Sequence, residues 1–96
     1  MEAFVVAMLN GRTTVLEYMV SRGFPVNSLL YGEPVLNVAV GNAMTPVVEC
    51  LVRCGADPGL SGSQGRPARE IAHALLEDDS RDADRRRIAE LCGLQP

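Results

Sequence analysis

The stretch LVRCGADPG, residues 51–59, contains the end of an apolar segment followed by residues that terminate a helix. Gly55 can take the left-handed conformation that closes a helix, and Pro58 prevents the helix from resuming. The same pattern occurs upstream in MVSRGFPVN, residues 19–27, where Gly23 stands 32 positions before Gly55. A recurrence at this interval is typical of proteins built from helical repeats.

Each of these glycines follows an apolar segment with helical spacing. The apolar residues recur at i, i+1, i+4 and i+5, which places them on one face of a helix. They are Val15, Leu16, Met19 and Val20 in the first copy, and Val47, Val48, Leu51 and Val52 in the second. We therefore expect one amphipathic helix before each glycine.

Polar residues mark where these two helices start. Thr13 precedes the first, and Thr45 followed by Pro46 precedes the second. We expect both threonines to cap free N–H groups, and Thr14 and Glu17 have the spacing of a capping box. Each unit then contains a short helix, a turn and a second helix that ends at glycine.

A third unit follows with a longer internal spacing. Ala72 lies 33 positions after Ala39, but Gly93 follows Ala72 by 21 residues. We expect a longer first helix over about residues 67–78, followed by a charged turn. Asp82 or Asp84 would then cap a last helix that runs through RRRIAELC.

The three-fold register resembles the ankyrin-repeat family. The second unit reads GEPVLNVAVGNAMTPVVECLVRCGAD (residues 32–57), the third supplies GRPAREIA and the first GRTTVLEYMVSRGFPVN. The family positions matched in the second unit are Gly32, Leu36, Ala39, Val48, Leu51 and Gly55-Ala56-Asp57. The resemblance covers about residues 3–93. It implies an all-α solenoid of stacked helix-turn-helix units joined by short hairpin-like loops. The chain would form a single domain, with units over approximately residues 1–27, 28–61 and 62–96.

The chain also departs from the family pattern. Pro34 and Pro67 stand where the family has threonine, and Asn37 and Glu70 replace its histidine. The first unit lacks a hairpin, and its opening segment MEAFVVAML is apolar on nearly every side. Terminal repeats usually carry a polar outer face, so this end is expected to be covered, either by more repeats of a longer array or by another surface.

Composition excludes several classes of function. The net charge of the 96 residues is −3 and no basic stripe is present, which argues against a nucleic-acid partner. No apolar run approaches the ~18 residues of a membrane span, and the start lacks the features of a signal peptide. The cysteine count is odd, at three, which favours reduced thiols in an intracellular compartment, with the cytoplasm as the first expectation.

The residues that can carry chemistry do not form a recognisable catalytic or metal motif. Cys50 and Cys54 lie one helical turn apart without a C-x-x-C pair, and we expect Cys50 to point inward and Cys54 to be partly exposed. His73 is the single histidine, which leaves little room for a triad, and the carboxylates of LLEDDSRDAD suit helix capping and a solvated turn. We therefore expect no enzyme activity, no metal and no cofactor. Thiol or metal chemistry through the cysteines stays open as a less favoured alternative.

The expected function is noncatalytic recognition of a partner protein. The resemblance implies that binding residues lie at the hairpin tips and on the exposed face of each first helix. The tip positions are Tyr31, Glu33, Gln64 and Arg66; the helix positions are Leu9, Asn10, Asn42, Ala74 and Leu75. Tyr31 and Arg66 are the strongest anchors, because Tyr and Arg are enriched at binding hot spots. Two alternatives remain: these are only solvated turn residues, or the exposed apolar ends pair chains into an oligomer or cap a longer array.

Overall fold

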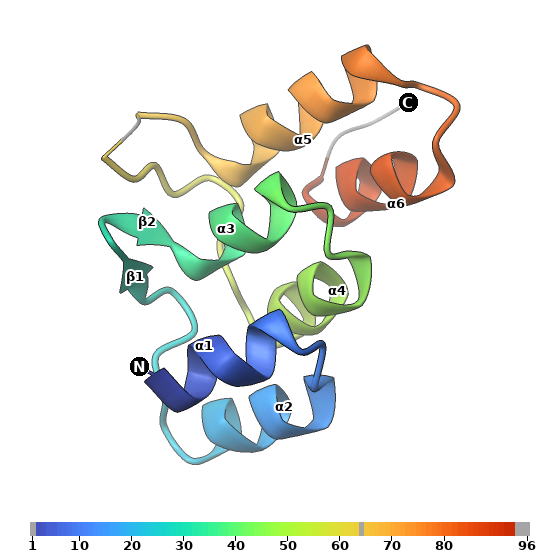
Figure 1. The fold of residues 1–96 in the computed structure, drawn as a ribbon. Helices are drawn as coiled ribbons and strands as arrows, with labels where there is room; N and C mark the ends of the chain where they lie inside the picture. Colours follow the sequence, from blue (N-terminus) through green and yellow to red (C-terminus); the bar gives the residue numbers. More distant parts are fainter. Residues whose placement is uncertain (1, 64, 94–96) are drawn as a thin grey trace.

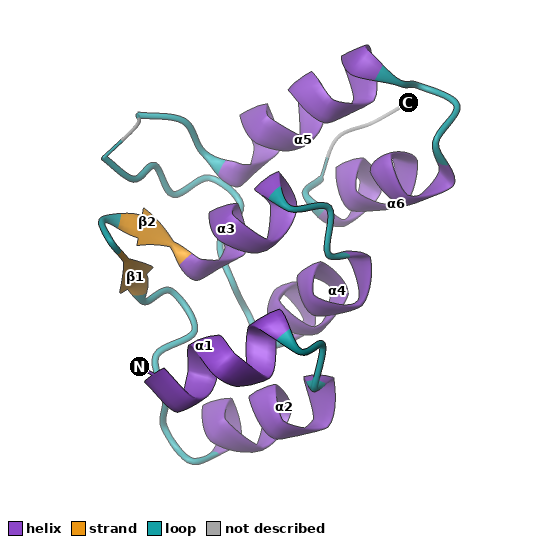
Figure 2. Ribbon diagram, in the orientation of Figure 1, coloured by secondary structure: helices purple, strands orange, loops and turns teal. Residues whose placement is uncertain are grey.

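The computed structural model describes residues 2–63 and 65–93, and within them it is mostly helical with one small sheet. Figure 2 shows the helices and the β-hairpin. The sequence predicts an all-α chain with hairpin-like loops, and the strands correct this in part: the loop between the first two units pairs as a short β-hairpin. The helices are α1 (Glu2–Leu9), α2 (Thr13–Ser21), α3 (Val35–Gly41), α4 (Thr45–Arg53), α5 (Ala68–Asp78) and α6 (Ala83–Leu91).

The six helices form three pairs that follow one another in space (Figure 1). Each pair consists of two consecutive helices joined by a short turn: α1 with α2, α3 with α4, and α5 with α6. The second helices pack in series, α2 against α4 and α4 against α6, while α3 packs against α5. The middle pair therefore has a neighbour on both sides, and the first and last pairs have one on a single side.

The loop after α2 contains the hairpin. Strands β1 (Leu29–Leu30) and β2 (Glu33–Pro34) are antiparallel. Tyr31 and Gly32 form the connecting turn with φ angles of +52° and +82°, the backbone of a tight two-residue β-turn that matches the twist of the strands. The corresponding loop before α5 forms only an isolated antiparallel bridge between Ser61 and Pro67.

The glycines end their helices as predicted. Gly23, Gly55 and Gly93 have φ angles of +103°, +99° and +87°, a region that side-chain-bearing residues rarely adopt. After two of them the chain bonds back onto the helix: the N–H groups of Phe24 and Ala56 donate to carbonyl oxygens five residues earlier. This arrangement satisfies carbonyl groups that would otherwise lack partners at the helix end.

The sequence predicted the side chains that cap three helices. The prediction is right for α6 and wrong for α2 and α4. Asp82 caps α6, because its Oδ1 accepts hydrogen bonds from the N–H groups of Asp84 at 2.9 Å and Arg85 at 3.3 Å. Thr13 and Thr45, in contrast, are the first residues of α2 and α4, and the preceding residues occupy the cap positions without a side-chain hydrogen bond. The N–H groups of both threonines already donate to a carbonyl two residues earlier, so the turn places each threonine one position too late to cap.

The capping box predicted in the first unit is also absent. Thr14 and Glu17 both lie within α2, which begins at Thr13. Glu17 instead accepts a hydrogen bond from Arg53 of α4. Its carboxylate therefore joins two helix pairs and does not close a helix end.

The core runs through all three pairs and consists mainly of aliphatic side chains. Its largest fully buried members are Phe4, Met8, Leu16, Leu36, Leu51 and Ile88. Phe4 stacks on Phe24 with ring centroids 4.2 Å apart, which ties the loop after α2 to α1. In the part of the chain that the structure describes, every helix is too short or too polar to cross a bilayer.

Candidate protein-binding surface

Tyr31 stands at the tip of the β-hairpin with 95% of its surface exposed. Its φ of +52° is uncommon for any residue with a side chain and is a clear outlier for a bulky one. Tight turns of this kind favour Asn, Asp or Gly at that position. The fold therefore holds a large aromatic side chain in solvent, in a backbone conformation that a smaller residue would adopt at lower cost.

The loop before α5 lies directly beside this hairpin. The N–H of Ser63 donates to the carbonyl oxygen of Gly32 at 2.9 Å, and the Ser63 Oγ donates to Glu33 Oε1 at 3.1 Å. Gly62 fits only because it lacks a side chain: a Cβ there would lie 2.6 Å from the Gly32 carbonyl oxygen and 2.5 Å from the Glu33 carboxylate. The two loops thus form one continuous surface, and Glu33 serves partly to join them.

Arg66 belongs to the same loop, and Gln64 lies outside the described residues. The Arg66 side chain is exposed, while its carbonyl oxygen accepts a hydrogen bond from the Nδ2 of Asn37 at 2.9 Å. Figure 1 shows the β-hairpin and this second loop on the same side of the helices. Of the four predicted tip residues, the structure therefore gathers Tyr31, Glu33 and Arg66 along one edge, here named the hairpin edge.

The asparagines predicted to bind from the helix face lie elsewhere. Asn10 and Asn42 follow α1 and α3, and each donates from its Nδ2 to a carbonyl four residues earlier, at 2.8 Å in both cases. Asn42 sits at the end of α3 opposite to the β-hairpin, about 10 Å along the helix axis at 1.5 Å per residue. Both asparagines are exposed, and they close helix ends in the same way.

The other helix positions are mixed in their exposure. Leu9 and Ala74 are exposed, whereas Leu75 is partly buried and packs against the core. Only Leu9 therefore offers a large apolar side chain to a partner, and it belongs to the first helix pair. The structure does not unite these positions with the hairpin edge.

The residue that supports this edge is not among those that the sequence predicted for the site. Asn37 is 3% exposed and is the one buried polar side chain among the described residues. Its Nδ2 bridges the carbonyl oxygens of Leu60 and Arg66, and so fixes the loop before α5 onto α3. A polar residue inside the apolar run VLNVAV was the available signal, because a buried amide normally needs partners.

Two of the three thiols considered for chemistry are buried. Cys50 and Cys92 are fully buried, and burial raises the pKa of each thiol from 9.0 to about 11; for Cys50 the nearby Cys54 and Glu17 add to the effect. Cys54 is partly exposed, as predicted, and all three cysteines are free. Within the described ranges no three Cys, His, Asp or Glu residues gather as metal ligands.

The remaining titratable residues form surface contacts. His73 Nδ1 lies 2.9 Å from Glu77 Oε1 on the exposed side of α5. Arg85 spans the acidic turn, donating to the Leu75 carbonyl oxygen at 2.8 Å and to Asp78 at 2.9 Å. Asp82 therefore caps a helix, as the sequence predicted for this turn, and Asp78 pairs with Arg85.

Comparison with known proteins assigns the chain to no family. No family model matches it, no curated protein matches it, and no solved structure matches it. The evidence for function is therefore the surface itself, above all the hairpin edge.

Proposed function

We propose that the chain is an ankyrin-type solenoid of three helix pairs that recognises a partner protein without catalysing a reaction. The regular offset between units supports the solenoid. Gly23 and Gly55, 32 positions apart, end α2 and α4 with nearly the same left-handed φ. Gly11 and Ala43 show the same offset and the same sign of φ in the turns within the first two pairs.

Contacts between successive units support the same arrangement. Asn27 Oδ1 accepts a hydrogen bond from the N–H of Asp57 at 2.9 Å, which joins the loops after α2 and α4. On the helices, Arg53 approaches Glu17 at 2.6 Å and Arg87 approaches Glu49 at 3.7 Å. Each unit thus contacts mainly its neighbours, which is the organisation that gives repeat proteins their extended binding surfaces.

The conformation and exposure of Tyr31 are the main support for the proposed recognition function. Its backbone conformation is unfavourable for an aromatic residue, and its ring gains little from burial. Local strain that a fold retains is often found at functional sites. A tyrosine on a rigid turn supplies a large contact area with few rotatable bonds. Its ring is exposed in the free protein and becomes buried when a partner binds, which favours the complex. Arg66, on the adjoining loop, adds a cationic group to the same edge.

Three observations favour a noncatalytic role inside a cell. Two of the three thiols are buried and protonated at neutral pH, so they are poor nucleophiles. The only histidine pairs with Glu77 at the surface of α5. Free cysteines, in odd number, suit a reducing compartment, for which the cytoplasm is our proposal.

The test uses the two tyrosines of the chain as a matched pair. A photo-crosslinking amino acid at position 31 identifies the partner in a lysate, and the purified partner is then titrated against the wild type and the variants Tyr31→Asn and Tyr18→Asn. Tyr18 is also exposed, at 63%, but lies on α2 away from the hairpin. We expect Tyr31→Asn to weaken binding by about 30-fold, the effect of a hot-spot residue, while Tyr18→Asn binds like the wild type.

Stability measurements separate lost contacts from lost folding. Asn suits the turn position better than Tyr, so Tyr31→Asn should unfold at the same or a higher temperature than the wild type. Weaker binding together with equal or greater stability assigns Tyr31 to recognition. Equal affinity of Tyr31→Asn and the wild type, or a partner that cross-links equally well from position 18, contradicts the proposal.

A further inference from the structure

Exposed apolar side chains gather on the first helix pair. Six large hydrophobic residues are exposed in the described part of the chain, and four of them lie on α1 and α2: Val6, Leu9, Val15 and Tyr18. The other two belong to the β-hairpin, and none lies on α5 or α6. Scattered apolar residues are normal on a protein surface, whereas a contiguous group indicates an interaction site.

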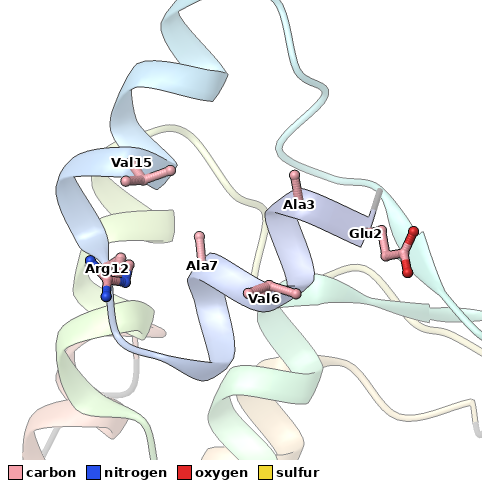
Figure 3. Close-up of a pocket in the computed structure, with 6 residues that line it drawn as sticks. All are labelled: Glu2, Ala3, Val6, Ala7, Arg12 and Val15. Carbon is pink, nitrogen blue, oxygen red and sulfur yellow. The ribbon is translucent and has the colours of Figure 1, made fainter.

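Two of these side chains, Val6 and Val15, border a groove between α1 and α2 (Figure 3). Figure 3 shows Ala3, Val6 and Ala7 along α1 with Val15 across from them on α2. The floor is apolar, and all six lining residues come from the first helix pair and its turn. We name this surface the α1–α2 groove.

The position of the groove explains why it is open. Val47 stands 32 residues after Val15 in the equivalent helix, and it is 1% exposed where Val15 is 42% exposed. The helix that carries Val47 has neighbours on both sides, α2 and α6, whereas α2 has only α4 among the second helices. The α1–α2 groove is therefore a surface of the kind that a further helix pair covers.

Opposite charges stand at the two ends of the groove. Glu2 lies at the start of α1 and Arg12 in the turn after it, and Figure 3 shows them at opposite ends of the row of apolar residues. Neither forms an ion pair among residues 2–63 and 65–93 as they are described. A two-fold axis that lies in the interface and runs perpendicular to this row places each end against the opposite end of the second copy.

We propose that the α1–α2 groove binds the α1–α2 groove of a second copy of this chain in a two-fold dimer. Val6 and Val15 of each copy fill the centre, and Glu2 of each copy faces Arg12 of the other. The surface is self-complementary in charge, because its two ends carry opposite charges, and in polarity, because its centre is apolar. A two-fold interface requires this self-complementarity. The groove shares no lining residue with the hairpin edge, so the second copy and a partner protein would contact different residues.

Head-to-tail stacking fits the structure less well. It would place the apolar groove against the last helix pair, whose exposed side chains are polar or charged apart from small alanines, as with His73, Glu77, Asp84 and Arg86. A head-to-tail assembly would also leave one groove uncovered however many copies it contained, so further copies could keep adding. Pairing groove to groove covers both apolar surfaces at once and stops at two copies.

Sedimentation equilibrium of the full chain from about 10 µM to about 1 mM tests the dimer, a range that suits a small interface. We expect the wild type to pass from monomer to dimer within it. The variants Glu2→Arg and Arg12→Glu each bring like charges together, and each should weaken dimerisation at least about tenfold. The double variant Glu2→Arg/Arg12→Glu should return to wild-type association.

Mixing the two single variants gives the sharpest result. In a two-fold dimer that contains one chain of each variant, both cross-pairs again join an acidic to a basic residue. The mixture should therefore dimerise more tightly than either variant alone. Val6→Gln should also weaken the dimer, and Leu29→Gln, at a similarly exposed residue of the β-hairpin, should not.

Circular dichroism and melting temperature show that the variants are folded, which is expected because both charged side chains are exposed. A wild type that stays monomeric at about 1 mM overturns the proposal. So does a dimer that persists in both charge reversals, or association that continues beyond two copies.

Discussion

The side-chain amide of Asn37 donates to the carbonyl oxygen of Arg66 at 2.9 Å and so joins the middle helix pair to the loop before α5. The same Nδ2 reaches the carbonyl oxygen of Leu60 at 3.3 Å. One buried amide therefore holds both ends of a loop segment, residues 60–66. Within this segment, Ser63 forms a hydrogen bond to the β-hairpin. The hairpin edge depends on a side chain that itself faces no solvent.

Replacing Asn37 should destabilise the protein through these two carbonyl groups. Asn37→Ala removes the donor, and we expect a loss of about 1–3 kcal/mol in the free energy of unfolding. Chemical denaturation measures it. Asn42→Ala is the control, because its amide makes a similar bond at the exposed end of α3; it should cost less than about 0.5 kcal/mol. Equal costs for the two variants would contradict the role assigned to Asn37.

Asn37→Asp should give a characteristic pH dependence. A carboxylate there would be buried and would face two carbonyl oxygens, so its pKa in the folded protein should rise above the unfolded value of ~3.9. Stability is then greatest at low pH, where the group is protonated in both states, and falls as pH rises through the folded pKa. Denaturation at pH 4 and pH 7 should show a larger deficit, relative to the wild type, at pH 7.

Leu51 tests the register of α4. It is fully buried, and Leu51→Ala should lower the free energy of unfolding by roughly 2–5 kcal/mol. Leu29→Ala, in the exposed part of the β-hairpin, provides the comparison and should change it by less than about 1 kcal/mol. Urea denaturation measures both. A cost below about 1 kcal/mol for Leu51→Ala would mean that α4 presents a different face to the core.

Asp82 tests the helix start that the sequence predicted correctly. Asp82→Ala removes the oxygen that accepts from the N–H groups of Asp84 and Arg85. We expect a loss of about 1 kcal/mol, seen as a lower melting temperature. Asp82→Asn keeps an acceptor oxygen and should retain most of the stability. If both variants lost the same amount, the charge near Arg85 would explain the effect better than capping.

The buried thiols should make the protein less stable at alkaline pH. The pKa values of Cys50 and Cys92 are raised from 9.0 to about 11, so the unfolded chain loses these protons before the folded chain does. The free energy of unfolding is then unaffected below about pH 8 and falls as pH rises from about 9 to 11, by up to about 2–3 kcal/mol per thiol.

The matched variant for this effect is Cys50→Ala/Cys92→Ala. It should be less stable than the wild type at pH 7, because two core side chains are shortened, but its stability should change less between pH 8 and pH 11. All nine basic residues are arginine, so no lysine titrates in that window. Parallel pH profiles of the two proteins would show that the thiols are not responsible.

Local features of the fold were accessible from the sequence. The ends of the helices at Gly23, Gly55 and Gly93 follow from backbone sterics, since glycine alone adopts positive φ without cost. The amphipathic spacing predicted the inward faces of α4 and of α2, apart from Val15 of α2, which is exposed. Helix α5 runs over residues 68–78, close to the predicted 67–78. These features depend on residues within one or two helical turns of one another.

The candidate site was predictable only in part. The glycine-rich loops followed from the residues, and the tip position of Tyr31 followed from the family resemblance of the sequence. The cross-loop bonds of Ser63 and the buried bridge of Asn37 followed from neither. The threonine caps failed because backbone turns place Thr13 and Thr45 inside their helices. Each of these features depends on how one loop meets the next segment, which the residue types alone do not specify.

Val15 and Val47 show what the sequence determines and what only the tertiary structure decides. The sequence by itself determined that both are valines at the same position of an amphipathic helix, because helical periodicity is a local property. Tertiary structure decided that Val47 is buried and that Val15 borders an open groove. The physical reason is that burial requires a neighbouring surface: among the second helices of the described residues, α4 packs against both α2 and α6, whereas α2 packs against α4.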